Sequence, residues 1–135
     1  MALANQVTLV DLTTAVAKSF KTKGTSLTGV AFAADARLAV LAEDELRLTD
    51  RRGRVIHAVK GTKLRSVQAL HGGHTLVVSG WGKHKLEVFS VVGEKLVRRF
   101  RAPLDWTQSY AVGDRYFVEA KTGAWFELDL ASLAR

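Results

Sequence analysis

Hydrophobic and polar residues alternate along most of the chain, with a period of two residues. The runs Leu46–Leu48, Leu86–Val88 and Phe126–Leu130 are clear examples. An alternation of this kind predicts short β-strands that each bury one face. Turn signals separate the runs, at Ala34-Asp35, Arg52-Gly53, Gly72-Gly73, Val92-Gly93, Gly113-Asp114 and Thr122-Gly123.

The runs also repeat at a constant distance, because Leu46, Leu86 and Phe126 occupy equivalent positions 40 residues apart. The strands around these positions repeat with them. We therefore predict units of four strands, a to d, and place their boundaries at 26–61, 63–103 and 104–135, the last of which ends after its c strand. Residues 1–25 hold a c-like and a d-like strand and complete a blade.

Four-stranded units repeated about every 40 residues are typical of β-propeller blades. The predicted fold class is therefore all-β, with antiparallel four-stranded propeller-type blades, about three per chain. A length of 135 residues fits one domain. In such blades the b strands are the most buried, and we expect this at Leu38, Val40, Leu76, Val78, Tyr116 and Val118.

The segment Gly29–Val59 resembles a WD40-like or YVTN-type propeller repeat. It combines an apolar first strand ending at Phe32, the turn Ala34–Arg37, an apolar second strand and a third strand ending at Asp50. The Trp-Asp pair of those repeats is replaced at its three positions by Thr49-Asp50, Phe89-Ser90 and Leu128-Asp129. The resemblance implies a scaffold that binds other proteins, and it implies no reaction.

One segment allows two interpretations. Leu9, Leu12, Val16 and Phe20 also fit helical spacing, with Asp11 as an N-cap. Residues 11–23 are therefore either a strand of the blade pattern or a helix. The helix would make the fold an antiparallel sheet or small barrel with an N-terminal helix.

Composition restricts the chemistry. The chain has no cysteine, which excludes disulfides, thiol nucleophiles and cysteine-bound metals. Neither a secretory signal nor a membrane-length apolar run is visible, so we expect a cytoplasmic protein with no membrane partner.

Catalytic motifs are also missing. The histidines His71, His74 and His84 lack the neighbouring carboxylates that a metal site needs, and Glu43–Glu45 is interpreted as a solvated turn. We expect no catalytic residues, no metal and no cofactor, and thus no enzyme. Asp11, Asp50 and Asp129 end their strands and are expected to accept hydrogen bonds from turn amides.

Charge is the strongest compositional signal, with a formal net charge of +7. Two groups of residues are candidates for binding an anion or a partner: the turn residues Trp81, Lys83, His84 and Lys85, and the arginines Arg51, Arg52, Arg98, Arg99 and Arg101. These arginines would ring the outer strands. They either form a basic rim for nucleic acid or an acidic protein, or protect the outer strands from edge-to-edge pairing. The tryptophans Trp81, Trp106 and Trp125 are expected to pack between blades.

The blade count predicts assembly. Propeller rings have about 4–8 blades, and the chain supplies about three. Two copies would close a six-bladed ring, so we expect a homodimer that serves as a protein-interaction scaffold. The alternative is a piece of a longer propeller.

Overall fold

The computed structural model describes residues 6–22, 27–42, 45–60, 65–80, 85–103 and 106–133. Strands dominate these residues, and every neighbouring pair of strands is antiparallel. The described helical elements are a 3-10 turn at His71–Gly73 and the four-residue helix α1 (Leu130–Leu133). The all-β prediction is confirmed. None of the helices described is long and apolar enough to cross a membrane.

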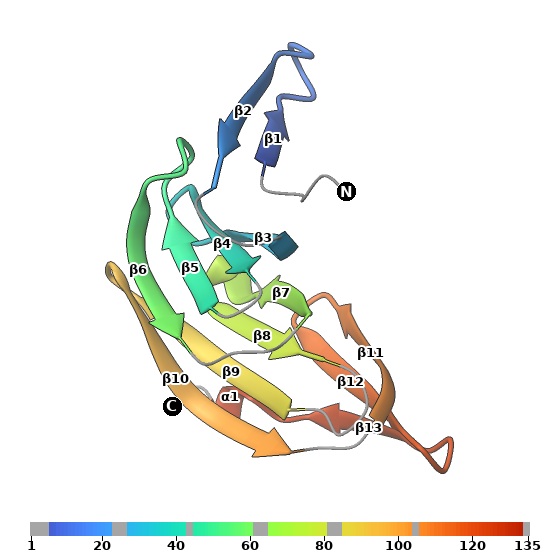
Figure 1. Cartoon of the computed structure of the whole chain (residues 1–135). Coiled ribbons are helices and arrows are strands. Elements are labelled where there is room, and N and C mark those ends of the chain that lie inside the picture. Colours follow the sequence, from blue (N-terminus) through green and yellow to red (C-terminus); the bar gives the residue numbers. More distant parts are fainter. Residues whose placement is uncertain are drawn as a thin grey trace, which may run out of the picture.

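Four sheets follow one another along the chain (Figure 1). The first is the N-terminal hairpin of β1 (Gln6–Val10) and β2 (Ala17–Lys21). Blade one contains β3 (Leu27–Ala33), β4 (Arg37–Ala42), β5 (Glu45–Thr49) and β6 (Val55–Lys60). Blade two contains β7 (Ser66–Leu70), β8 (Thr75–Ser79), β9 (Lys85–Val92) and β10 (Lys95–Pro103). Blade three contains β11 (Trp106–Val112), β12 (Arg115–Ala120) and β13 (Trp125–Leu128).

The N-terminal segment is a hairpin, so the helical alternative for residues 11–23 is wrong over the described residues 11–22. Val7 pairs with Phe20 across the two strands, and both join the cluster of apolar side chains against blade one. Asp11 explains why the chain turns here instead of forming a helix. Its Oδ1 accepts hydrogen bonds from the amides of Thr13 and Thr14, at 2.9 and 3.3 Å.

The predicted aspartate turns are confirmed at the other two positions as well. Asp50 Oδ1 accepts from the amides of Arg52 at 2.8 Å and Arg54 at 3.0 Å. Asp129 Oδ1 accepts from the amide of Ser132 at 3.2 Å, which caps α1. In each case the carboxylate satisfies amides that leave the strand ladder.

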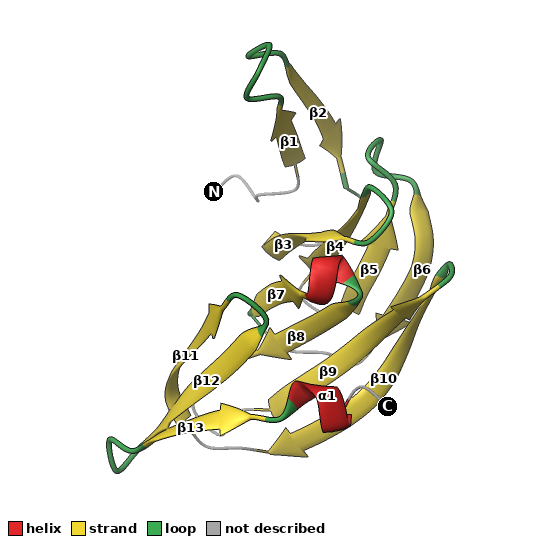
Figure 2. Cartoon of the chain, turned by 180° about the vertical axis from the view of Figure 1, so that it is seen from behind, coloured by secondary structure: helices red, strands yellow, loops and turns green. Residues whose placement is uncertain are grey.

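Three apolar layers hold the sheets together. One lies between the hairpin and blade one and includes Val7, Leu38 and Val40. The largest joins blades one and two. The third joins blades two and three, and Leu130 of α1 packs into it. The view from behind shows the helix α1 itself beside β9 (Figure 2). All six b-strand residues expected in the core are buried: Leu38, Val40, Leu76, Val78, Tyr116 and Val118.

The a–b turns of neighbouring blades are joined by hydrogen bonds. The Ala34 amide of blade one donates to Gly73 O of blade two at 3.0 Å, and the His71 amide donates to Asp114 Oδ1 of blade three at 2.8 Å. Gly73 has φ +86°, and a Cβ built there would lie 2.5 Å from the Ala34 nitrogen. Glycine is therefore required at this turn by both conformation and space.

The described sheets form an open array with two ends. Figures 1 and 2 place the N-terminal hairpin at one end and blade three at the other. The sequence predicted that blade three ends after its third strand. Its described residues form three strands and continue from β13 into α1.

Candidate functional site

The predicted site residues fall into three groups, and the first cannot be placed. Trp81, Lys83 and His84 lie outside the described residues. Lys85 is the first residue of β9, and its side chain is not described. The proposal that this turn binds an anion or a partner therefore stays a prediction.

The second group is the set of arginines on β10. A β-bulge between Arg98 and Phe100 shifts the register against β9. Residues 98 and 101 are separated by an odd number and would face opposite sides of a regular strand. Because the bulge inserts one residue, Arg98 and Arg101 reach the same face.

That face carries a buried carboxylate. Glu87 on β9 is fully buried, and its Oε1 lies 2.8 Å from Arg98 Nε and 3.5 Å from Arg101 Nε. Neither oxygen makes an aligned hydrogen bond with another described residue, so the contact is an ion pair held by charge. Arg98 and Arg101 thus neutralise an interior charge, a role that the basic-rim interpretation did not foresee. Arg99 is exposed and donates to Ser90 Oγ at 3.2 Å.

The third group, Arg51 and Arg52, lies at the exposed β5–β6 turn. Arg51 Nε donates to Ala36 O at 3.3 Å, and its guanidinium lies 5.9 Å from the centre of the Phe32 ring. Both arginines line an open cavity of about 640 Å³ between blade one and the hairpin, together with Lys18. Apolar side chains form much of the rest of its wall: Leu9, Val10, Val16 and Phe32.

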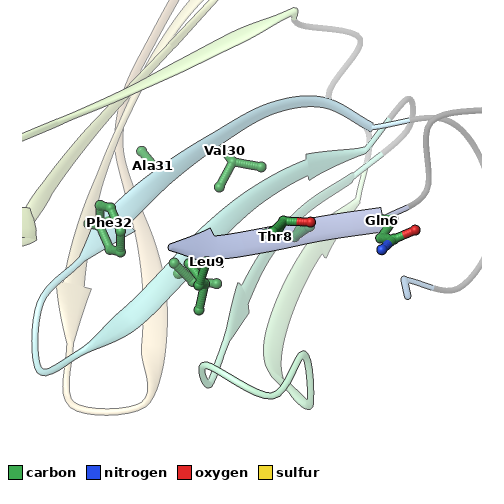
Figure 3. Close-up of a pocket in the computed structure, with 8 residues that line it drawn as sticks. Gln6, Thr8, Leu9, Val30, Ala31 and Phe32 are labelled. Carbon is green, nitrogen blue, oxygen red and sulfur yellow. The ribbon is translucent and has the colours of Figure 1, made fainter. Parts of the chain in front are cut away.

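A second cavity, of about 310 Å³, adjoins the first and shares Leu9 and Phe32 with it. It lies where β1 crosses the face of blade one (Figure 3). Val30 and Phe32 of β3 form its apolar side, and they remain 44% and 61% exposed. The edge of β1 beside this groove pairs with no other strand in the described part of the chain. We call this region, comprising β1, Val30, Phe32, Lys18, Arg51 and Arg52, the N-terminal face.

The opposite end of the array is also apolar. Tyr110 and Trp125 stack on the outer side of blade three, with ring centres 5.7 Å apart, and Val112 beside them is 62% exposed. Tyr110 Oη donates to Gln108 Oε1 at 2.8 Å, which fixes the ring. The expectation that Trp125 packs between blades is wrong within this chain, because its indole is half exposed. We call Tyr110, Val112 and Trp125 the C-terminal face.

Charged groups border the C-terminal face in fixed positions. Arg115 donates to both carboxylate oxygens of Glu127, at 2.8 and 2.9 Å, and its guanidinium lies 5.1 Å from the Phe117 ring centre. This hydrogen-bonded pair lowers the pKa of Glu127 and raises that of Arg115. The face is therefore an aromatic platform with an ordered polar margin.

Metal chemistry finds no support in the described residues, which contain no group of three histidine or acidic side chains arranged to hold an ion. His71 Nδ1 lies 2.9 Å from Thr75 Oγ1 and serves the a–b turn. His57 Nδ1 accepts from the amide of Leu96 at 2.8 Å and links blades one and two.

Comparison with known proteins fits this geometry. No family model matches the sequence, and no curated protein matches it. Among solved structures, the chain is similar to the β-propeller domain of Cps50 (Swd1) from Myceliophteria thermophila, with a TM-score of 0.64 and 14% identity over 93% of this chain. A protein of unknown function from Bacteroides caccae gives 0.60 and 13% over 92%. A eukaryotic initiation factor gives 0.54 and 12% over 70%.

The fold is that of β-propeller blades. At such low identity the similarity describes architecture alone. The chain spans 52% of the Cps50 domain, 54% of the Bacteroides protein and 25% of the initiation factor. It thus spans about half the length of the Cps50 domain and of the Bacteroides protein.

Sequence reasoning missed several residues that matter. Arg37 is nearly buried and bridges two blades, because its guanidinium donates to Ala34 O and to Gly93 O. Glu87 carried one available signal, because it is the single acidic residue in the mostly apolar strand β9. Phe32, Tyr110 and Val112 gave no signal, because alternation marks a strand face as apolar without saying what covers it.

Proposed function

We propose that this protein is a non-enzymatic interaction scaffold that associates with itself to close a propeller ring. The observation that carries the proposal is the exposure of apolar side chains at both ends of the blade array. Phe32 and Val30 lie at one end, and Val112, Tyr110 and Trp125 lie at the other. Contiguous apolar surface of this kind is typical of interaction sites.

The number of blades in the chain supports self-association. Three blades are fewer than the roughly 4–8 of known rings, and the chain covers 52% of the Cps50 domain and 54% of the Bacteroides caccae protein. Two copies therefore provide about the length of one such propeller. Two-fold closed assemblies are also the commonest homo-oligomers.

The alternative function is binding of nucleic acid or another anionic ligand through the basic surface. The net charge of +7 and the grouping of Lys18, Arg51 and Arg52 around one cavity favour it. The pairing of Arg98 and Arg101 with Glu87 weakens it, because the buried carboxylate offsets one of their two positive charges. An acidic protein partner would use the same cavity. We retain a cytoplasmic location in the proposal, consistent with the absence of cysteine.

Sedimentation equilibrium and duplex binding, measured side by side between about 50 and 500 mM salt, test the two functions. The scaffold proposal expects reversible self-association that persists at high salt, since apolar burial dominates it. Phosphate contacts would instead give duplex binding that falls by orders of magnitude over this range. Duplex binding of that kind by a protein that stays monomeric would overturn the scaffold proposal.

A further inference from the structure

The inner strands of adjacent blades lie side by side within this chain. The a strands β3 and β7 run next to each other, and a Cβ built at Gly29 would lie 3.3 Å from Val67 (Figure 1). Ala31 and Ala33 pack into the same interface. The face of β3 that points the other way carries Val30 and Phe32, and nothing among the described residues provides an a strand against it.

A first strand that could lie against this face of β3 is present at the other end of the chain. β11 is the a strand of blade three, and its exposed side presents Tyr110 and Val112. The stacked Trp125 extends the same surface. Aromatic side chains held in place by neighbours are typical anchors of protein interfaces.

Both ends of the array also carry strand edges that no described strand pairs with. The hairpin provides two strands, and the free edge of β1 pairs with no other strand described in the structure. Blade three provides three strands, and the outer edge of β13 has no partner among the strands described. Over the residues that the structure describes, neither end forms a four-stranded blade like blades one and two.

Charge distinguishes blade three and the residues after it from the rest of the chain. Residues 104–135 contain five acidic and three basic side chains, a net charge of −2. Residues 1–103 contain eight acidic and seventeen basic ones, a net charge of +9. The end that carries the C-terminal face is therefore attracted to the rest of a second copy and not to its own kind.

We propose that the ring closes head to tail, with the C-terminal face of one copy covering the N-terminal face of the other. β11 of one copy lies on β3 of its partner, so that Tyr110 and Val112 cover the exposed Val30 and Phe32. The shared blade contains β11–β13 from one copy and β1–β2 from the other, which is five strands, one more than in blades one and two. This arrangement rests on the proposed self-association and adds which surfaces meet.

A mixing experiment with two interface variants tests this arrangement. Phe32→Asp blocks the N-terminal face, and Val112→Asp blocks the C-terminal face. Both positions are largely exposed in the chain, so both variants should fold, as checked by circular dichroism and melting. Val92→Asp, at the half-exposed end of β9, is the matched control.

Head-to-tail closure makes a specific prediction for sedimentation of the three samples. Each face variant alone has both contacts of the ring broken, and its dissociation constant should rise more than tenfold. An equimolar mixture regains one intact contact and should form dimers that neither variant forms alone. Val92→Asp should behave like the parent protein.

The other outcomes separate the two proposals. If the parent protein dimerises but one face variant keeps full affinity, or the mixture gains nothing, the head-to-tail arrangement is wrong and self-association stands. If the parent protein is a monomer at all concentrations, both proposals fail. If an aspartate variant misfolds, Val30→Ser and Tyr110→Ser replace the pair, with the same expectations.

Discussion

Glu87 Oε1 lies 2.8 Å from Arg98 Nε, so the outermost strand of blade two supplies the counter-charge for a carboxylate buried on its neighbour β9. The side chain of Glu87 is fully buried, whereas that of Arg98 is about one-third exposed. Arg101 reaches the same oxygen at 3.5 Å because of the β-bulge. Arginines on the surface strand β10 thereby compensate the negative charge of a buried carboxylate.

Removing the nearer arginine should destabilise the fold. Arg98→Gln leaves Glu87 buried with Arg101 alone, and we expect a loss of about 2 kcal/mol in the free energy of unfolding. Arg99→Gln, one residue further along β10, serves as the control and should change it by less than about 0.5 kcal/mol. Urea denaturation of both variants measures the difference, and equal stabilities would show that the ion pair does not matter to the fold.

The core assignment predicts a second contrast. Val78 is fully buried on β8, whereas Val92 is half exposed at the end of β9. Val78→Asp buries an unpaired charge and should cost about 4 kcal/mol or abolish folding. Val92→Asp should be close to neutral. A Val78→Asp protein that melts like the parent would contradict the position of β8 inside blade two.

Two glycines provide a matched test of the contact between blades. Gly73 and Gly93 both have positive φ, but a Cβ at Gly73 meets the Ala34 backbone at 2.5 Å, and a Cβ at Gly93 meets nothing within 4 Å. Gly93→Ala should cost about 1 kcal/mol, from backbone strain alone. Gly73→Ala should cost at least about 2 kcal/mol more, because backbone must move. Similar melting temperatures for the two variants would refute the close approach of blades one and two.

Acid should weaken the Asp50 turn. The backbone hydrogen bond from Arg54 is the largest cause that lowers the pKa of Asp50 below its ordinary value of 3.8. Because the folded pKa is the lower one, the stabilisation is complete above pH 3.8 and is lost as the pH falls through the folded pKa. The stability difference between the parent protein and Asp50→Asn should therefore shrink with acid below about pH 4. A difference that does not change between pH 7 and pH 2 would contradict this.

Much of the fold was predictable because it follows from local rules. Alternation marked the strands, and the 40-residue spacing of Leu46, Leu86 and Phe126 marked the blades. The Asp11 turn had two sequence interpretations, since Leu9, Val16 and Phe20 fit a helix as well as a strand pair. Cross-strand contact between Val7 and Phe20 and the packing of both against blade one decide it.

The sites were less predictable, because they depend on register and on what lies opposite. A bulge at Arg99 cannot be inferred from alternation, yet it decides that Arg98 and Arg101 face Glu87 together. The exposure of Phe32 and Val112 depends on which blades are present beside them. Sequence patterns describe single strands. Register depends on the neighbouring strand, and exposure depends on the neighbouring sheet.

Multi-angle light scattering of the parent protein, from about one to several hundred micromolar, tests ring closure most directly. Two copies that close a ring should approach a single mass of twice 14.8 kDa and gain nothing beyond it as the concentration rises. A mass that stays at 14.8 kDa throughout would contradict self-association, and a mass that keeps growing with concentration would contradict closure.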